Sequence, residues 1–322
     1  MKNISKTLTI RGNKLFPIGI GTWGIGGFAE KNPNNPDDKQ IEAMAHAIQK
    51  GLNYIEMNMW SAEGYSAFLL SKAIKKSGVN RKDLFITFVG YPYNVETLDE
   101  LEKLLDKFLT MIKSDYVDSF QTSAFTAKLG EEETNNRVED LLKKGKCRYT
   151  SFTNGNLEII KKYKSLFNDK LIAHEVCHNF EIRENWDNGI IPWAIENDIL
   201  TVIYQPLRRN RTALRNWPLL VELSRKYNKA QNQIILNWLC SKGFLPLNKS
   251  ENIEHINENI AALDFKMEDS DLKQIDEFRP PQWITPKIDW SRSGDGKIDG
   301  DGLYVDQLPN IFDEEYDKIL KV

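Results

Sequence analysis

Short apolar runs alternate along the chain with longer segments in which apolar residues recur every three or four positions. In residues 39–50, Ile41, Met44, Ala45 and Ile48 share one face of a helix. Further helices are predicted over residues 98–112, 190–196 and 219–227. The apolar runs have the length of buried strands, and they lie at residues 16–20, 54–57, 84–89, 116–121, 148–152, 171–176, 200–204 and 244–247. Strands that alternate with helices in this way are typical of a parallel sheet.

Eight strand–helix units are the number that closes a (β/α)8 TIM barrel, which is therefore the predicted α/β fold. We assign residues 1–278 to one barrel domain, because no repeat or low-complexity linker divides them. Residues 8–14 are predicted to form an N-terminal hairpin that turns at Arg11-Gly12-Asn13. Residues 279–322 form a C-terminal extension rich in Asp, Gly and aromatic residues, which we expect to pack on the barrel, over its mouth.

Composition and charge narrow the class of protein. The 322 residues carry a formal net charge of −3, which gives no reason to expect nucleic acid or an anionic membrane as partner. Three cysteines, far apart and odd in number, indicate reduced thiols rather than a disulfide framework. The N-terminus has no secretion signal, and no apolar stretch is long enough to span a membrane. We expect a cytoplasmic protein with a small-molecule substrate; the oligomeric state is left open.

Three short motifs match part of a known binding-site pattern, but their surroundings or their missing ligands argue against that site. Residues 19–24, GIGTWG, match the dinucleotide fingerprint, but prolines at 33 and 36 precede any helix, so we favour a glycine-rich loop at the barrel mouth. Residues 174–178, HEVCH, match a zinc motif, but they continue a strand, where two histidines lie roughly 13 Å apart at ~3.3 Å per residue. Residues 291–302 lack both end carboxylates of a calcium loop. We therefore predict no metal site.

Eight stretches, in this order, resemble aldo-keto reductases: PIGIGTW (17–23), GLNYI (51–55), DYVD (115–118), GKCR (145–148), YQPL (204–207), NKS (248–250), HINEN (255–259) and ALDF (262–265). The resemblance implies a barrel that binds NADP(H) or NAD(H) without a Rossmann domain. It also implies reduction of a carbonyl, with a tyrosine as acid assisted by lysine, aspartate and histidine. A phenol, with a pKa of about 10, needs a neighbouring cation to act as that acid.

The resemblance places the four catalytic positions on residues of other types. The aspartate falls on Glu56, the tyrosine on Ser61, the lysine on Val89 (or Phe88) and the histidine on Ser123. A serine hydroxyl is too weak an acid to replace the phenol, and no lysine occurs between residues 83 and 102. Nearby phenols that could serve as the acid instead are Tyr65, Tyr91 and Tyr93. The usual proton-transfer residues are thus predicted to be replaced.

Most of the cofactor positions implied by the resemblance are kept. Asn154 and Tyr204 match the nicotinamide contacts, and Lys249 with Ser250 matches the pair that binds the 2′-phosphate. The remaining candidates are Glu258 and Asn259 at the adenine, Glu175 in place of a glutamine, His255 in place of an arginine, and Arg208 in an arginine-rich loop. These positions favour NADP(H) over NAD(H), although binding of no cofactor stays an alternative. For Lys249, Ser250, Glu258 and the arginines, a solvated surface is the other interpretation.

Three functions remain open from the sequence. The first is an atypical oxidoreductase that acts on a small carbonyl or alcohol substrate, acidic or phosphorylated ones included, and uses a residue such as Glu56 for the proton. The second is a non-redox lyase or isomerase in which Glu56, Glu175 or His178 at the mouth acts as base or acid. The third is an inactive NADP(H)-binding protein with a regulatory role. Kept cofactor positions favour the first and third, and the replaced catalytic residues favour the second and third.

Overall fold

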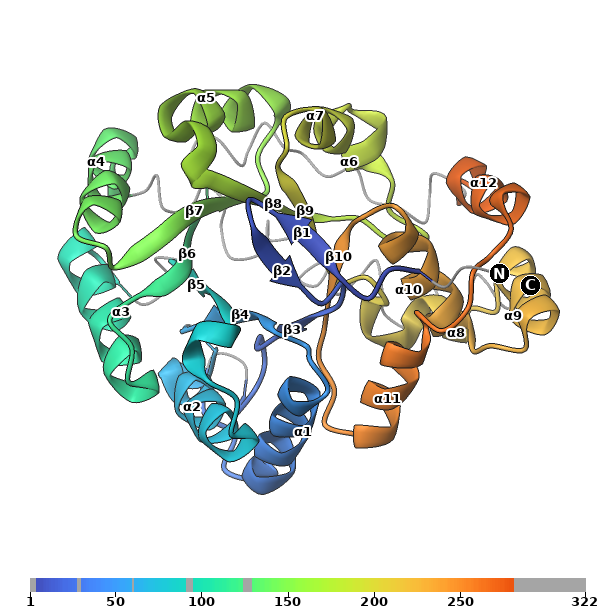
Figure 1. Ribbon diagram of the computed structural model, residues 1–322, viewed down its shortest axis with the longest axis horizontal. Helices are drawn as coiled ribbons and strands as arrows, with labels where there is room; N and C mark the ends of the chain where they lie inside the picture. The colour runs from blue at the N-terminus through green and yellow to red at the C-terminus, as the bar shows by residue number, and fades with distance from the viewer. Residues whose placement is uncertain (1–3, 28–29, 60, 91–94, 124–128, 281–322) are drawn as a thin grey trace.

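Eight parallel strands close into a barrel in the computed structural model, which describes residues 4–27, 30–59, 61–90, 95–123 and 129–280 (Figure 1). In chain order the strands are β3 (Gly19–Gly21), β4 (Tyr54–Asn58), β5 (Phe85–Val89), β6 (Val117–Ser123), β7 (Cys147–Thr153), β8 (Leu171–Cys177), β9 (Leu200–Tyr204) and β10 (Leu245–Asn248). Each strand pairs with the next, and β10 closes the ring on β3. The predicted (β/α)8 barrel is confirmed. The first strand is shorter than expected, and Pro17, which has no N–H for a sheet, lies in the part that does not pair.

Helices surround the barrel on all sides (Figure 1). They are α1 (Asp37–Gln49), α2 (Tyr65–Ser77), α3 (Leu98–Ile112), α4 (Glu131–Lys143), α5 (Leu157–Phe167), α6 (Glu184–Asp187), α7 (Ile190–Glu196), α8 (Arg211–Leu214), α9 (Pro218–Tyr227), α10 (Gln231–Ser241), α11 (Ile253–Ala261) and α12 (Asp269–Glu277). Short 3-10 turns lie at η1 (Ser61–Gly64), η2 (Arg81–Asp83), η4 (Asn168–Lys170) and η5 (Arg208–Asn210). No helix within the described ranges is long and apolar enough to cross a membrane.

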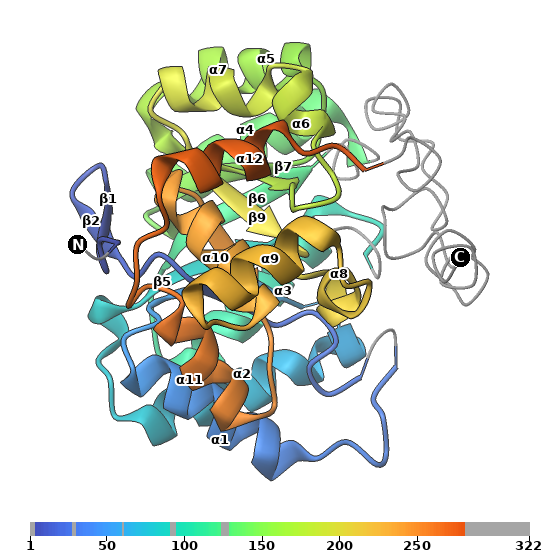
Figure 2. The same ribbon diagram turned by 90° about the vertical axis from the view of Figure 1, so that its right-hand side faces the viewer.

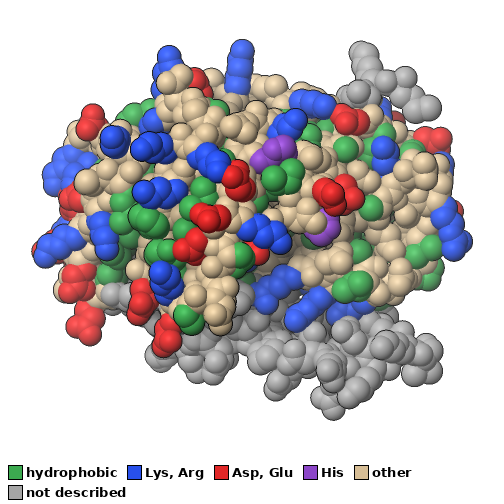
Figure 3. Space-filling view, turned by 90° about the horizontal axis from the view of Figure 1, so that it is seen from below, with side chains coloured by type: hydrophobic (Ala, Val, Ile, Leu, Met, Phe, Trp, Pro, Cys, Tyr) green, Lys and Arg blue, Asp and Glu red, His purple; other side chains and the backbone are tan. Residues whose placement is uncertain are grey.

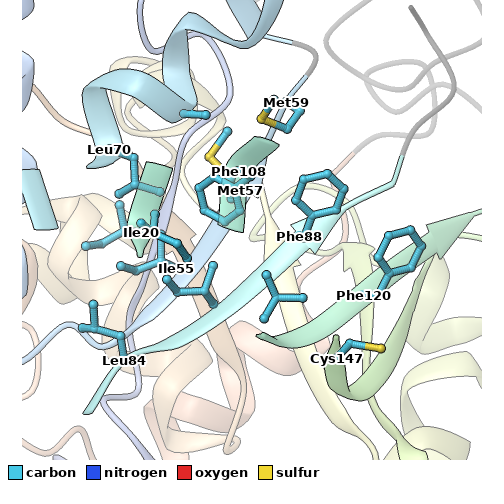
Figure 4. Close-up of a cluster of buried hydrophobic side chains, with 14 of the residues drawn as sticks. Ile20, Ile55, Met57, Met59, Leu70, Leu84, Phe88, Phe108, Phe120 and Cys147 are labelled. Atoms are coloured by element: carbon cyan, nitrogen blue, oxygen red, sulfur yellow. The ribbon is translucent and has the colours of Figure 1, made fainter. Parts of the chain in front are cut away.

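The outer face of the barrel is held to its helices by an apolar layer (Figure 4). Helix α3 begins where the Thr97 side chain accepts a hydrogen bond from the Glu100 N–H, and it buries one apolar face. From that face Phe108 packs on Phe88 of β5, with 5.9 Å between ring centroids, and Phe88 packs on Phe120 of β6 at 5.7 Å. Because alternate residues of a strand face opposite sides, Thr87 and Val89 then face the barrel interior.

The N-terminal hairpin, β1 (Leu8–Ile10) and β2 (Asn13–Leu15), covers one end of the barrel (Figure 2). Its turn needs two residues with positive φ, which Arg11 (47°) and Gly12 (77°) supply. Ile10 and Leu15 are buried in the same apolar cluster as Tyr54 and Leu245 from the barrel. The predicted hairpin is confirmed, and it closes the end opposite the carboxyl ends of the strands.

Two of the three short motifs lie within the described residues and have the structural context predicted for them. The HEVCH motif lies on β8 and just beyond it, and the described residues between β3 and α1, 22–27 and 30–36, form no helix. Within the described ranges, no three His, Cys, Asp or Glu side chains are grouped as metal ligands. Three buried cysteines form no disulfide. The predicted C-terminal extension beyond residue 280, with the calcium-like segment, lies outside the described residues. On the face in Figure 3, acidic and basic side chains are interspersed.

Candidate active site

Three polar side chains meet inside the barrel. Glu56 comes from β4, Gln121 from β6 and Glu175 from β8. The Gln121 Nε2 donates a hydrogen bond of 2.8 Å to Glu175 Oε2, and the carboxyl groups of Glu56 and Glu175 are hydrogen-bonded to each other. Since β4 and β8 lie opposite each other in the ring of eight strands, this carboxyl pair bridges the barrel interior. Glu56 is 7% exposed and Glu175 is 5% exposed.

Two carboxyl groups can form a hydrogen bond only when one of them carries a proton. Burial raises the pKa of Glu56 well above its usual value, and the charge of Glu175 and the hydrogen bond to it raise that pKa further. Burial also raises the pKa of Glu175, but the hydrogen bonds from Glu56 and Gln121 act in the opposite direction. Burial, the charge of Glu175 and the hydrogen bond to it therefore all favour the protonated form of Glu56.

The other three candidate catalytic residues lie at the carboxyl ends of strands or just beyond them. Ser61 is fully buried in η1, and its Oγ accepts a hydrogen bond of 3.0 Å from the Gly24 N–H. Val89 and Ser123 are the last residues of β5 and β6, and both are buried. The hydroxyl of Tyr65, a phenol that could act as the acid, is hydrogen-bonded to Asp37 at the start of α1. The phenols at positions 91 and 93 lie outside the described residues.

The candidate nicotinamide contacts are joined to one another. Asn154 follows β7 with a φ of 60°, a conformation that asparagine tolerates better than most residues. Its Nδ2 donates to Thr153 Oγ1 at 3.1 Å, and the Tyr204 hydroxyl donates to its Oδ1 at 2.8 Å. Its backbone N–H donates to the Glu175 carbonyl at 2.8 Å. The structure thus brings Asn154, Glu175 and Tyr204 together from three neighbouring strands.

A buried histidine fixes the backbone of this group. The His174 Nε2 lies 2.7 Å from the Asn154 carbonyl oxygen, so this nitrogen carries the proton and donates. Burial lowers the pKa of His174 to about 4, against a smaller rise from the hydrogen bond, and the ring is therefore neutral at pH 7. The zinc-like spacing around His174 was expected to be a strand end with polar residues, and His174 acts there as a hydrogen-bond donor.

The candidate phosphate contacts lie beside the glycine-rich loop after β3. Lys249, Ser250 and Asn259 line one pocket of about 400 Å³, part of which is open to solvent. The Lys249 Nζ donates to the Gly24 carbonyl at 3.4 Å. Burial lowers the pKa of Lys249, and the charge of Arg209 lowers it further, against the opposing effect of Glu251. The Lys249 ammonium group is thus influenced by a carboxylate, Glu251, and more weakly by a second cation, Arg209.

The remaining candidates at this end of the site are spread out. The Arg209 guanidinium lies over the Trp23 ring, 4.9 Å from its centroid, so this arginine also reaches the glycine-rich loop. His255 and Glu258 lie on the exposed side of α11. The structure therefore brings Lys249, Ser250 and Asn259 together and leaves His255 and Glu258 on the surface.

The arginine-rich loop contains a buried ion-pair cluster that the sequence did not indicate. Glu181, fully buried in the segment after β8, accepts two hydrogen bonds from Arg215, at 2.9 and 2.8 Å, and one from Trp217 Nε1 at 2.7 Å. Arg208, 3% exposed, forms an ion pair with the same carboxylate. The candidate residue Arg208 thus joins the loops after β8 and β9. A lone glutamate in a loop has no periodicity that could have identified it.

Comparisons with known proteins agree on one family. The model of the aldo/keto reductase family matches residues 17–280. A methylglyoxal reductase of Escherichia coli is 22% identical over 281 residues, covering 85% of this chain and 95% of that protein. An NADPH-dependent alpha-keto amide reductase of Saccharomyces cerevisiae is 27% identical over 276 residues, 81% of this chain and 86% of that protein.

Solved structures show the same fold. A thermostable aldo-keto reductase, solved with the inhibitor epalrestat, has a TM-score of 0.76 and 27% identity, covering 86% of this chain and 99% of that one. An aldo-keto reductase from Klebsiella pneumoniae in complex with NADPH has a TM-score of 0.72 and 21% identity, covering 88% of this chain and 97% of that one.

Proposed function

The chain belongs to the aldo/keto reductase family, a family of oxidoreductases, and from this premise we propose that it binds NADP(H) in preference to NAD(H). We further propose that it interconverts a small carbonyl compound and its alcohol, with the carboxyl pair Glu56–Glu175 in place of the usual tyrosine acid. The observation that carries the proposal is the carboxyl pair inside the barrel, connected through the backbone of Glu175 to the joined group of Asn154 and Tyr204.

The residues present fit a phosphorylated nucleotide. Lys249 and Arg209 are like charges held close enough for one to lower the pKa of the other, and an anion between them would relieve that repulsion. Ser250 and Asn259 add hydrogen-bonding groups in the same pocket. NADP(H) carries a 2′-phosphate that NAD(H) lacks, and this additional anionic group suits a site with basic side chains.

At the other end, Asn154 offers an amide for hydrogen bonding and Tyr204 offers a ring for stacking. When bound, the nicotinamide ring would supply or accept the hydride. The protein must then exchange a proton with the substrate oxygen, which Val89 cannot do and which a serine hydroxyl such as that of Ser61 does poorly. Glu56 and Glu175 hold one ionisable proton between them and keep a small exposed surface.

The substrate class follows from the charge near the mouth. Arg208 and Arg215 form ion pairs with Glu181, and the Arg209 guanidinium lies over the Trp23 ring beside the glycine-rich loop. A cation in this position favours a substrate or cofactor group that carries negative charge. We therefore propose that acidic or phosphorylated compounds belong in the first panel of substrates.

Fluorescence titration of the full chain with NADPH and NADH tests the cofactor, and oxidation or reduction of a panel of aldehydes, ketones and alcohols tests the reaction. We expect NADPH to bind at micromolar concentrations and Glu56→Gln to lower kcat at least about 100-fold, the order of a general acid–base contribution. The exposed Glu158→Gln should retain full activity. Turnover that survives Glu56→Gln would contradict the role of the carboxyl pair, and absence of nucleotide binding would contradict the proposal as a whole.

A second candidate is an inactive NADP(H)-binding protein with a regulatory role. It is favoured by Ser61, whose Oγ is engaged by the Gly24 N–H, and by Val89, which offers no charge where the family has a lysine. Nucleotide that co-purifies unchanged, with no turnover of any substrate in the panel, would support it. Turnover of a substrate without any nucleotide would instead favour a lyase or isomerase that uses Glu56 and Glu175 as acid and base.

A further inference from the structure

A row of uncharged polar side chains in the barrel interior leads to Glu175. Ser119 and Gln121 of β6 and Ser151 of β7 are at most 1% exposed, and Gln121 is paired with Ser151 in the register of the two strands. We propose that Gln121 is a positioning residue for the Glu175 carboxyl group: its amide holds one carboxyl oxygen as a hydrogen-bond acceptor and leaves the other oxygen for proton exchange. The inference rests on the proposed function, since it concerns the same carboxyl group, and it adds a residue on which that group depends.

The hydrogen bonds run in one direction along this row. The Ser119 Oγ donates to Ser151 Oγ at 2.9 Å, and the Ser151 Oγ donates to Gln121 Oε1 at 3.4 Å. The Gln121 Nε2 then donates to Glu175 Oε2 at 2.8 Å. Each side chain of the row therefore turns its donor towards Glu175, and the amide is bonded at both its oxygen and its nitrogen.

The strand β6 fixes the place of this amide. The next residue, Thr122, is hydrogen-bonded to Tyr163 of α5, on the outer side of the barrel. Because alternate residues of a strand face opposite sides, Ser119 and Gln121 face the interior. A side chain carried by a strand of a closed sheet is placed more rigidly than one carried by a loop. The geometry therefore suits Gln121 to holding a partner in one position.

The amide donor gives the two oxygens of Glu175 different roles. Oε2 accepts the N–H of Gln121, and protonation of that oxygen would replace a charge-assisted hydrogen bond with a weaker one. Burial raises the pKa of Glu175, and the hydrogen bonds from Glu56 and Gln121 act in the opposite direction. Proton exchange in the proposed reaction therefore takes place at Oε1 of Glu175 or at the carboxyl group of Glu56.

The titratable neighbours of Glu175 come from β4. Glu56 is hydrogen-bonded to it, and Tyr54 lies within reach of its charge. Burial raises the pKa of Tyr54, a hydrogen bond from Thr87 lowers it, and the charge of Glu175 raises it further, so the phenol is neutral at pH 7. The neutral donor Gln121 thus acts on Glu175 from the side opposite these two groups, through β6.

Gln121→Met tests this role, because methionine is similar in length and has no side-chain N–H. In the full chain, labelled with ¹³C at the glutamate carboxyl carbons, the NMR signal of Glu175 is identified by its loss in Glu175→Gln. We expect Gln121→Met to raise the midpoint of the Glu175 titration by about 1 to 2 pH units, which corresponds to the loss of one hydrogen bond to a charged group. Ser151→Ala should raise the midpoint by less, because the amide keeps its donor and loses its support.

Thr122→Val is the matched control, because it removes a buried hydrogen bond at the neighbouring position of β6 without touching the carboxyl groups. It should lower the free energy of unfolding and leave the midpoint of Glu175 unchanged. A midpoint that Gln121→Met does not move, or that Thr122→Val raises equally, would overturn the inference. If Gln121→Met does not fold, Ser151→Ala decides by the same comparison.

Turnover separates the inference from its premise. With NADPH and the best aldehyde or ketone of the panel, Gln121→Met should lower kcat about tenfold or more and change KM for NADPH by less than about threefold, because the amide acts on the proton and not on the nucleotide. A wild type that turns over none of these compounds would contradict the proposed function. The titration of Glu175 would still show whether Gln121 positions that carboxyl group.

Discussion

Replacing Glu181 with glutamine removes the carboxylate that holds two buried arginines. The Glu181 side chain is fully buried, and the side chains of Arg208 and Arg215 are 2% and 4% exposed. Arg215 lies 2.8 Å from a carboxylate oxygen, and Trp217 donates to the other oxygen. The amide of glutamine could still accept one hydrogen bond, but its NH₂ group would face a guanidinium. We expect Glu181→Gln to leave both positive charges without a balancing negative charge.

The magnitude follows from the geometry. At 2.8 Å and an effective dielectric of about 20, one such pair attracts by about 6 kcal/mol before desolvation is subtracted. Measured losses on breaking a buried pair from one side are about 3–5 kcal/mol, so we take that range for the free energy of unfolding. For a chain of this length, about 2 °C per kcal/mol converts the range into a fall in melting temperature of about 6–10 °C.

Urea unfolding followed by circular dichroism, with a thermal melt as a second measurement, checks the prediction. Glu139→Gln is a matched control, because Glu139 forms an exposed i,i+4 pair with Lys143 and its side chain is 45% exposed. That control should change stability by less than about 1 kcal/mol. A loss below about 1 kcal/mol for Glu181→Gln would refute the reasoning, because it would show that the buried arginines do not need their counter-charge.

Three further predictions concern the phosphate pocket, the buried histidine and the hairpin. Lys249→Gln should weaken NADPH binding about 10- to 100-fold and NADH binding much less, since a charged hydrogen bond contributes about 1.5–3 kcal/mol; competitive titration measures both. The pKa of His174 is about 4 in the folded protein and about 6.5 in the unfolded chain, so the free energy of unfolding should fall by up to about 3 kcal/mol as the pH drops from 6.5 towards 4. Urea unfolding at pH 7 and at pH 4.5 should show this loss, and His174→Gln should remove it. Gly12→Ala should cost about 1 kcal/mol in a thermal melt, because φ is +77° and no atom lies near enough to clash with a new Cβ.

The sequence predicts the fold well because each element carries its own signal. The bounds of α3 are those expected from its apolar period. The eight predicted runs overlap the eight strands, although β6 (VDSFQTS) and β7 (CRYTSFT) carry polar residues among their apolar ones. The hairpin is likewise indicated by its glycine turn.

The sequence predicts individual residues of the site, but it does not predict which of them contact one another. The resemblance pointed to Glu56 and Glu175 separately, while their contact across the barrel depends on the closure and register of the sheet. The arginine-rich loop was conspicuous, but the partner of Arg208 and Arg215 came from another loop and had no pattern around it. Long-range pairings of this kind carry no local signal, so sequence periodicity cannot reveal them.

The hairpin has a consequence for the timing of any reaction at the carboxyl pair. Ile10 and Leu15 belong to a buried apolar cluster with Tyr54 and Leu245 that closes the far end of the barrel. Protons can then enter or leave Glu56 and Glu175 from the mouth alone. A nucleotide bound at Tyr204 and Asn154 would block that mouth. The number of protons on the pair would be set before the nucleotide binds and would stay fixed until it leaves. The protonation state during each turnover would then depend on the pH of the solution at the moment of nucleotide binding.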